Sequence, residues 1–140
     1  MLGADNQQER LNPWWIVGFT DGEGCFSIST FRNTSTKSGK QTLYEFVVTQ
    51  GEKSINSLEA IRNYFDCGHI YINRRYDNHK YNLYRYCVRK QEDLLKIIIP
   101  FFKKYPLQTS KQSQFEKFCK TLESKSSTTI RQIPKKTGKI

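Results

Sequence analysis

The chain has no long hydrophobic run, no pair of closely spaced cysteines and no acidic residue after Glu123. Because no apolar run approaches about 18 residues, the sequence predicts no membrane-spanning helix. The four cysteines, Cys25, Cys67, Cys87 and Cys119, lie far apart and form no C-x-x-C pair. This spacing is typical of neither a zinc site nor a disulfide framework, and it favours a reducing compartment.

Basic residues outnumber acidic ones, 23 against 13, and give a formal net charge of +10. Much of this excess lies in the acid-free segment after Glu123, so charge alone is only partial support for a nucleic-acid partner. The length of 140 residues and the 14% aromatic content suit one folded domain. We expect an N-terminal extension over residues 1–11, a single domain over 12–124 and a basic, flexible tail over 125–140.

Hydrophobic periodicity predicts the element order helix–strand–strand–helix–strand–strand–helix, or αββαββα. Two hairpins in this order can form one four-stranded antiparallel sheet with all helices on its apolar face, which is an α+β fold. The opposite face is then left for solvent or a ligand. The expected elements are a helix from Asn12–Pro13 to about Glu23, strands at 26–31 and 41–50, a helix at 53–65, strands at 69–75 and 81–89, a short helix at 94–99 that Pro100 kinks or restarts, and a last helix at 110–124.

The first predicted helix carries four residues that do not favour a helix. Gly18 and Gly22, one turn apart, each lose about 1 kcal/mol of helix propensity relative to Ala. Asp21 and Glu23 place carboxylates at the C-terminal end of the helix, where the helix dipole favours cations. Small residues at this spacing allow a second backbone to approach closely, and clustered carboxylates indicate a divalent cation.

This segment resembles the LAGLIDADG motif of homing endonucleases, and the resemblance extends over about residues 12–122. Glu23 replaces the second acid of the motif by its one-carbon homologue, and Thr20 is the one polar departure. The remaining positions match the motif outright (Gly18, Asp21 and Gly24) or are like-for-like (Ile16, Val17, Phe19 and Gly22).

The resemblance implies a saddle-shaped sheet and a sequence-specific, metal-dependent endonuclease that makes a double-strand break in DNA and leaves 3′ overhangs. The chain contains no second copy of the motif, so the implied active form is a homodimer with a long, roughly palindromic target. Members of this family are typically encoded in introns, often in organelles. The expected compartment is therefore a mitochondrion or a chloroplast.

The resemblance also implies a metal site at the end of the motif. The expected ion is Mg²⁺, held by the Glu23 carboxylate and the Gly22 carbonyl. Mn²⁺ is expected to substitute for it, and Ca²⁺ to bind without supporting cleavage. Asp21 ranks second, either as a structural acid at the helix end or as a group outside the inner coordination shell.

Polar and basic residues around the metal are expected to position water and to neutralise developing charge. By resemblance these are Gln50, at the end of the second strand, and Lys111, at the start of the last helix. Many relatives carry a basic residue close to the position of Ser54. Either Lys53 takes over that role or the role is vacant.

The dimer interface is expected along the motif helix, because the motif helices of two subunits pack together in this family. Gly18 has an alternative use, which is close packing inside one subunit. Trp15 and Phe19 suit either the core or the interface. The expected interface residues are Trp15, Gly18, Phe19 and Gly22.

DNA contacts are expected on the non-core face of the strands, since a saddle of two such sheets can lay β-ribbons along the major groove. The first hairpin turn adds polar and basic side chains, and Arg74 and Lys80 are expected on phosphates. The full set of expected DNA-binding residues is Ser27, Ser29, Phe31, Arg32, Asn33, Lys37, Lys40, Gln41, Glu45, Val47, Tyr71, Asn73, Arg74, Arg75, Lys80 and Arg85.

Two other functions remain open at this point. An RNA splicing maturase or a non-cleaving nucleic-acid binder can share this fold after losing the chemistry, although the intact Glu23 favours a nuclease. The second alternative is an unrelated α+β protein in which Thr20–Gly24 is an acidic turn. That turn is too short for an EF-hand and lacks its ligand spacing.

Overall fold

The structure is a computed structural model that describes the backbone of residues 11–73 and 81–138, with side chains up to residue 126. It contains one four-stranded antiparallel sheet in the order β1-β2-β4-β3. The predicted order αββαββα and the α+β class are confirmed. The elements are α2 (Pro13–Glu23), β1 (Gly24–Arg32), β2 (Lys40–Gly51), a 3-10 turn (Glu52–Ser54), α3 (Ile55–Phe65), β3 (His69–Asn73), β4 (Leu83–Val88), α4 (Gln91–Asp93), a π-helical segment (Leu94–Ile98), α5 (Ile99–Lys104) and α6 (Lys111–Gly138).

Helix α2 begins and ends where the local sequence favours it. The side chain of Asn12 accepts a hydrogen bond from the Trp14 amide at 2.8 Å, and Pro13 occupies the first turn, where its missing N–H costs nothing. The helix passes directly into β1 at Gly24. A Cβ at Gly24 would lie 2.6 Å from the Thr20 Cγ2 atom, so this junction requires glycine.

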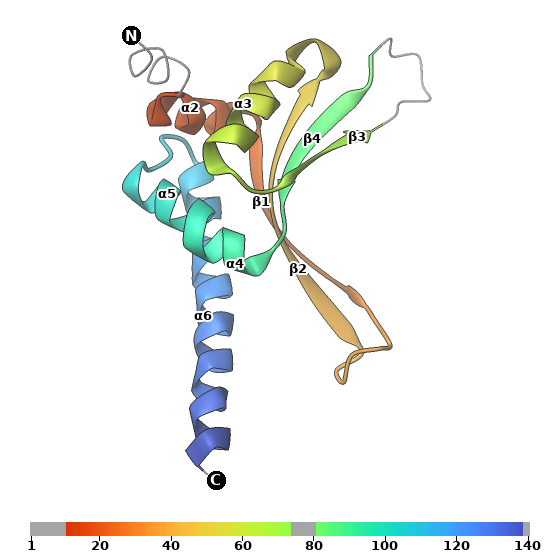
Figure 1. Ribbon diagram of the computed structural model, residues 1–140, viewed down its shortest axis with the longest axis vertical. Helices are drawn as coiled ribbons and strands as arrows, with labels where there is room; N and C mark the ends of the chain where they lie inside the picture. Colours follow the sequence, from red (N-terminus) through yellow and green to blue (C-terminus); the bar gives the residue numbers. More distant parts are fainter. Residues whose placement is uncertain (1–10, 74–80, 139–140) are drawn as a thin grey trace.

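All helices pack on one face of the sheet and leave the other face open (Figure 1). Phe26 of β1 lies at the centre of an aromatic cluster, with ring centroids 5.1 Å from Phe46, 5.1 Å from Phe115 and 5.5 Å from Phe102. These rings join β1 and β2 to α5 and α6 in one core. The sheet is therefore anchored through its inner face, and we call the opposite face the open face.

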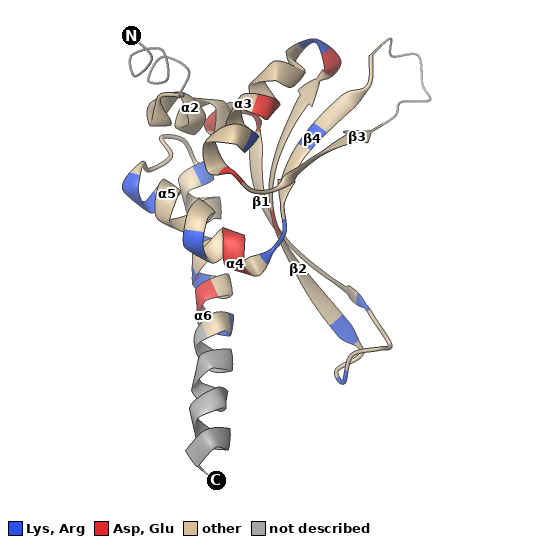
Figure 2. Ribbon diagram, in the orientation of Figure 1, with Lys and Arg blue, Asp and Glu red and all other residues tan. Residues whose placement is uncertain are grey.

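The two hairpins extend in opposite directions from the middle of the sheet (Figure 1). The register explains this arrangement, because Arg32 pairs with Lys40 near the first turn whereas Gly51, at the other end of β2, pairs with Leu83 near the second. Basic residues are present at the first turn and along β4 (Figure 2). The open face thus spans two hairpins that carry positive charge.

Helix α6 differs from its prediction. Its backbone is helical from Lys111 to Gly138, so the expected end near Ser124 is wrong (Figure 1). Helical hydrogen bonding continues through a Ser/Thr/Lys-rich stretch in which the apolar spacing that guided the prediction has ceased. That residues 125–140 form a separate, flexible tail stays a prediction. No helix in the described part of the chain is long and apolar enough to cross a membrane.

Candidate catalytic site and nucleic-acid interface

Helix α2 has a buried side and an exposed side. Ile16, Val17 and Thr20 face the core and are fully buried, whereas Gly18 and Gly22 are exposed. An added Cβ at either glycine would have no atom within 4 Å. Packing among the described residues therefore does not explain these glycines, which counts against the alternative use considered for Gly18.

The exposed side of α2 also carries aromatic surface. Trp15 is 40% exposed and stacks on Phe19, with ring centroids 5.0 Å apart. Phe19 is half-buried against the core, so it serves the core and the surface together. A flat apolar strip bordered by Gly18 and Gly22 suits close contact with another helix.

Asp21 is bound on both carboxylate oxygens by the loop that precedes α6. One oxygen accepts from the Gln108 amide at 2.9 Å. The other accepts from the Thr109 amide at 3.2 Å and from the Thr109 hydroxyl at 2.6 Å. These bonds join residues 87 and 88 positions apart, so Asp21 fixes the position of the α6 N-terminus relative to α2.

The same loop delivers Lys111 to the end of the motif. The Thr109 hydroxyl accepts from the Lys111 amide at 3.2 Å, and the Lys111 ammonium donates to the Gly24 carbonyl. Gly24 directly follows Glu23. The structure therefore brings Lys111, as predicted, to the C-terminal end of α2.

Glu23 is exposed at the last position of α2. Neighbouring Gly22 lies in the last helical turn, where carbonyl groups have no intrahelical donors. Within the described residues no group of three or more His, Cys, Asp or Glu side chains could hold a metal ion, and the oxygens of Asp21 are already engaged by Gln108 and Thr109. Among the described residues, the end of α2 thus offers the Glu23 carboxylate and a carbonyl, which fit a hard divalent cation only as part of a larger oxygen ligand set.

Gln50 and Lys53 lie at the far end of β2. Gln50 pairs with Tyr84 and is half-buried at the edge of the helix-covered face, since it shares the alternation of Phe46 and Val48. The Lys53 ammonium lies 4.7 Å from the centroid of the Tyr81 ring. Lys53 thus contacts Tyr81 next to the second hairpin, whereas Lys111 contacts the end of the motif, so Lys111 is the better supported basic residue.

The open face carries most of the expected DNA-binding residues in register. Ser27 pairs with Glu45, and Arg85 lies between Thr49 and Tyr71. Arg32, Asn33, Lys37 and Lys40 lie at the first hairpin turn, while Arg74, Arg75 and Lys80 lie outside the described residues. The other expected residues on this face are Ser29, Phe31, Gln41, Val47 and Asn73.

Three of these side chains are less available than alternation suggests. Glu45 and Val47 are each only 9% exposed because the strands on both sides cover them. The side chain of Asn33 organises the first turn: it donates to Gln41 at 2.6 Å and accepts from the Ser35 hydroxyl and amide. DNA contacts by these residues stay predictions, with less free surface than expected.

Arg89 is a candidate that the sequence analysis missed. Its side chain lies on the open face, one alternation beyond Arg85 and Cys87, and it forms an ion pair with Glu45. The predicted strand at 81–89 includes Arg89, and the pattern 85, 87, 89 contains the signal, but its partner Glu45 lies 44 positions away along the chain. Burial raises the pKa of the neighbouring Cys87 thiol, so this sulfur stays protonated at neutral pH and offers no thiolate for chemistry.

The fold and the end of α2 define an α+β class in which a helix ends in an exposed carboxylate and leads directly into a four-stranded antiparallel sheet. The sequence matches the LAGLIDADG endonuclease family over residues 16–122, and the chain belongs to this family.

The similar proteins include both curated sequences and solved structures. "Probable intron-encoded endonuclease 3" of Neurospora crassa is 35% identical over 111 residues, which cover 79% of this chain and 20% of that protein. "Probable intron-encoded endonuclease Cox1-I1b" of Schizosaccharomyces pombe is 36% identical over 107 residues, or 76% of this chain and 26% of that protein. The chain thus spans only about a fifth to a quarter of these curated relatives.

Two solved structures are similar in fold as well as sequence. The homing endonuclease I-TnaI has a TM-score of 0.76 and 38% identity, with coverage of 84% of this chain and 75% of that chain. I-SmaMI bound to cleaved DNA has a TM-score of 0.74 and 35% identity, with coverage of 84% and 37%. Another I-SmaMI structure contains an uncleaved DNA target in the presence of calcium ions.

Proposed function

We propose that this chain is a sequence-specific, divalent-metal-dependent DNA endonuclease that acts as a homodimer on a roughly palindromic target and leaves 3′ overhangs. The observation that carries the proposal is the end of α2, a helix with an open glycine face, where an exposed Glu23 directly precedes Gly24, whose carbonyl accepts from Lys111. Relatives named as endonucleases and a relative bound to cleaved DNA support it.

The proposed homodimer is supported by the exposed glycine surface of α2 and by the incomplete set of metal ligands among the described residues of one chain. Gly18 and Gly22 give α2 a surface on which a second backbone can pack closely, with Trp15 and Phe19 at its margin. A two-fold axis through this helix pair would bring two Glu23 carboxylates together. Two carboxylates that approach each other repel unless a cation lies between them.

The metal that we propose is Mg²⁺, with Mn²⁺ as a substitute and Ca²⁺ as an ion that binds without cleavage. Glu23 and the Gly22 carbonyl of each chain would hold it, and DNA phosphate oxygens would complete the oxygen ligands. When bound, such an ion activates water and stabilises charge on the phosphate.

Other residues of the chain would position the phosphate and the attacking water and neutralise negative charge. Lys111 holds a positive charge at the Gly24 carbonyl, where the negative charge of a bound phosphate would develop. Asp21 holds the loop that carries Lys111, so we assign it a positioning role outside the metal ligands. We retain Gln50 as the proposed water-organising residue and give Lys53 a secondary place, near the second hairpin.

The open face of each subunit would read one half-site, and the positive charge of both hairpins would contact phosphates. Affinity should then fall steeply with salt. The relatives include proteins named as intron-encoded and one named as mitochondrial, and we propose an intron-encoded, organellar origin for this chain as well.

A selection from a randomised palindromic DNA library tests the function. The wild-type protein is incubated with the library in Mg²⁺ and, separately, in Ca²⁺, and the broken and bound molecules are sequenced. We expect cleavage at one near-palindrome in Mg²⁺ and binding without cleavage in Ca²⁺. Binding without cleavage in Mg²⁺ and in Mn²⁺ would contradict the nuclease and favour a binder or an RNA splicing maturase on the same fold.

A further inference from the structure

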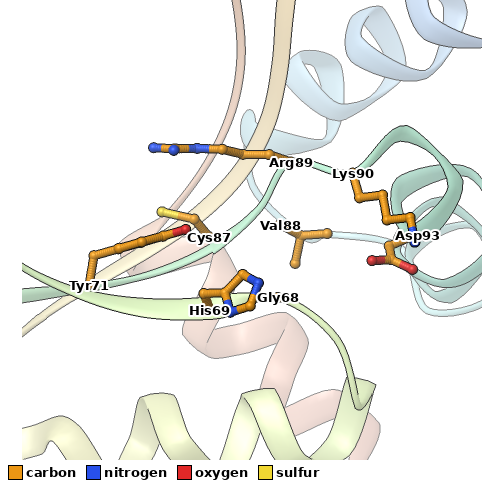
Figure 3. A pocket seen from close by; sticks show the side chains of 8 residues that line it. All are labelled: Gly68, His69, Tyr71, Cys87, Val88, Arg89, Lys90 and Asp93. Atoms are coloured by element: carbon orange, nitrogen blue, oxygen red, sulfur yellow. The ribbon is translucent and has the colours of Figure 1, made fainter.

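Arg89 is held in place on the open face by two side chains from two other strands. Its Nε donates to the buried carboxylate of Glu45 on β2. Its guanidinium carbon lies 5.3 Å from the centroid of the Tyr71 ring on β3. In Figure 3 the Cys87 side chain lies between those of Arg89 and Tyr71, and Lys90 and Asp93 lie on the other side of the pocket.

This arrangement leaves the outer part of the guanidinium available. Glu45 engages only Nε, and among the described residues the two terminal nitrogens of Arg89 have no hydrogen-bond partner. The Arg89 side chain is 42% exposed, whereas that of Glu45 is 12% exposed. The four remaining N–H donors thus form a fork whose direction is set before any ligand binds.

Arg85 provides a comparison on the same strand and the same face. It has no ion pair among the described residues, and its Nε is buried without a partner. Arg85 therefore presents a full positive charge, while Arg89 and Glu45 together are neutral. The positive charge of Arg85 would attract a phosphate. At Arg89 the nearby Glu45 carboxylate would repel the phosphate and offset the attraction.

We propose that Arg89 is a specificity-determining residue that reads a guanine in the major groove, with Glu45 and Tyr71 as the residues that orient it. The O6 and N7 atoms of guanine are neutral acceptors, and they match an arginine fork in a bidentate arrangement. The neutral Arg89–Glu45 pair suits such a base edge better than it suits a phosphate anion. This inference rests on the proposed DNA-binding function and assigns one base contact within it.

The test compares Arg89→Gln with Arg85→Gln in binding selections from a randomised DNA library in Ca²⁺, followed by salt titrations on selected duplexes. For Arg89→Gln we expect a guanine preference at one position of each half-site to fall about tenfold to a hundredfold, with an unchanged salt slope. For Arg85→Gln we expect weaker binding to all sequences and a salt slope reduced by about one.

Two further variants distinguish loss of the Arg89–guanine contact from destabilisation of the fold. The double variant Glu45→Gln/Arg89→Gln leaves no unpaired buried carboxylate, and it should lose the same guanine preference. Glu45→Gln alone should increase non-specific affinity and steepen the salt slope, because the charge of Arg89 is no longer neutralised.

Uniform loss of affinity in Arg89→Gln with a lower salt slope would overturn the proposal in favour of a phosphate contact. An unchanged base preference in both Arg89 variants would overturn it too. If the wild-type protein itself shows no sequence preference, the proposed function fails together with this inference, and the wild-type control alone reveals that case.

Discussion

The two sides of helix α2 differ in how far packing within the subunit explains their residues. The inner side, with Ile16, Val17 and Thr20, is fully buried, and its residues are explained by packing. The outer side, with Gly18, Gly22 and Glu23, makes no contact, in the part of the chain that the structure describes, that would require these residue types. Residues that cost helix stability and gain no contact among the described residues support the proposed partners of this helix, which are a second subunit, a metal and DNA.

Asp21 and Glu23 repeat this contrast at the scale of two carboxylates. Asp21 accepts three hydrogen bonds from the loop before α6, while Glu23 is exposed at the helix end. Although the two acids lie two positions apart in one motif, one serves the structure of the chain and the other faces outward. The predictions below test the two sides in turn.

The largest effect is expected for Glu23→Gln, which removes the outward charge and keeps the shape. We expect cleavage in Mg²⁺ to fall at least about a hundredfold, with DNA binding retained in Ca²⁺. Single-turnover cleavage of the selected duplex measures this. The same substitution at Glu59 on α3 is the matched control and should leave the rate unchanged. A wild-type rate for Glu23→Gln would refute the role of Glu23 in metal binding.

Asp21→Asn tests the inward carboxylate. Its amide nitrogen would face the N–H groups of Gln108 or Thr109, so the loop that carries Lys111 should loosen. We expect the single-turnover rate to fall about tenfold to a hundredfold, with DNA affinity in Ca²⁺ nearly unchanged.

Asp21→Glu and Thr109→Val complete this test. Asp21→Glu keeps the charge and should restore part of the rate. Thr109→Val removes only the hydroxyl between Asp21 and Lys111 and should have a smaller effect. If Asp21→Asn lowers only the melting temperature and leaves the rate intact, Asp21 does not position the site.

Thr20→Val should stabilise the inner side. The Thr20 hydroxyl is buried, and it has no hydrogen-bond partner within the described residues. Replacing it by a methyl group of similar size should raise the free energy of unfolding by about 1 kcal/mol. Urea denaturation measures the change. The control Thr20→Ser keeps the hydroxyl, removes a methyl group and should lower stability by about 0.8 kcal/mol; equal effects of both variants would contradict the explanation.

Gly18→Ala should have the smallest effect on the stability of the subunit. It should stabilise the folded monomer and weaken the association of two monomers. Because an added Cβ would meet no atom of the described residues within 4 Å, alanine should stabilise the isolated subunit by up to about 1 kcal/mol. At a close helix–helix contact the same methyl group should cost about 1–3 kcal/mol of association. Sedimentation equilibrium and urea denaturation measure the two quantities. The control Asn63→Ala on α3 should raise helix propensity without changing dimer association. If Gly18→Ala does not weaken the dimer, the interface lies elsewhere.

Local patterns were enough to predict the order of elements and the sheet. The Asn12–Pro13 start of α2 and the alternation in β1 and β2 depend on neighbouring residues, and the structure has them as expected. The predicted end of α6 was wrong because helical backbone can continue beyond the residues at which the apolar periodicity stops. Arg89 was missed because its importance comes from Glu45, 44 positions away.

The sequence by itself determined the motif, the alternation of the strands and the presence of two acids at a helix end, because these are properties of adjacent residues. Only the tertiary structure decided which acid turns inward, that a Cβ at Gly18 or Gly22 would meet no atom of the described residues within 4 Å, and that Lys111 contacts Gly24 across 87 positions. The physical reason is that hydrogen bonds and ion pairs act over a few ångströms in space. Separation along the chain carries little information about which groups come that close.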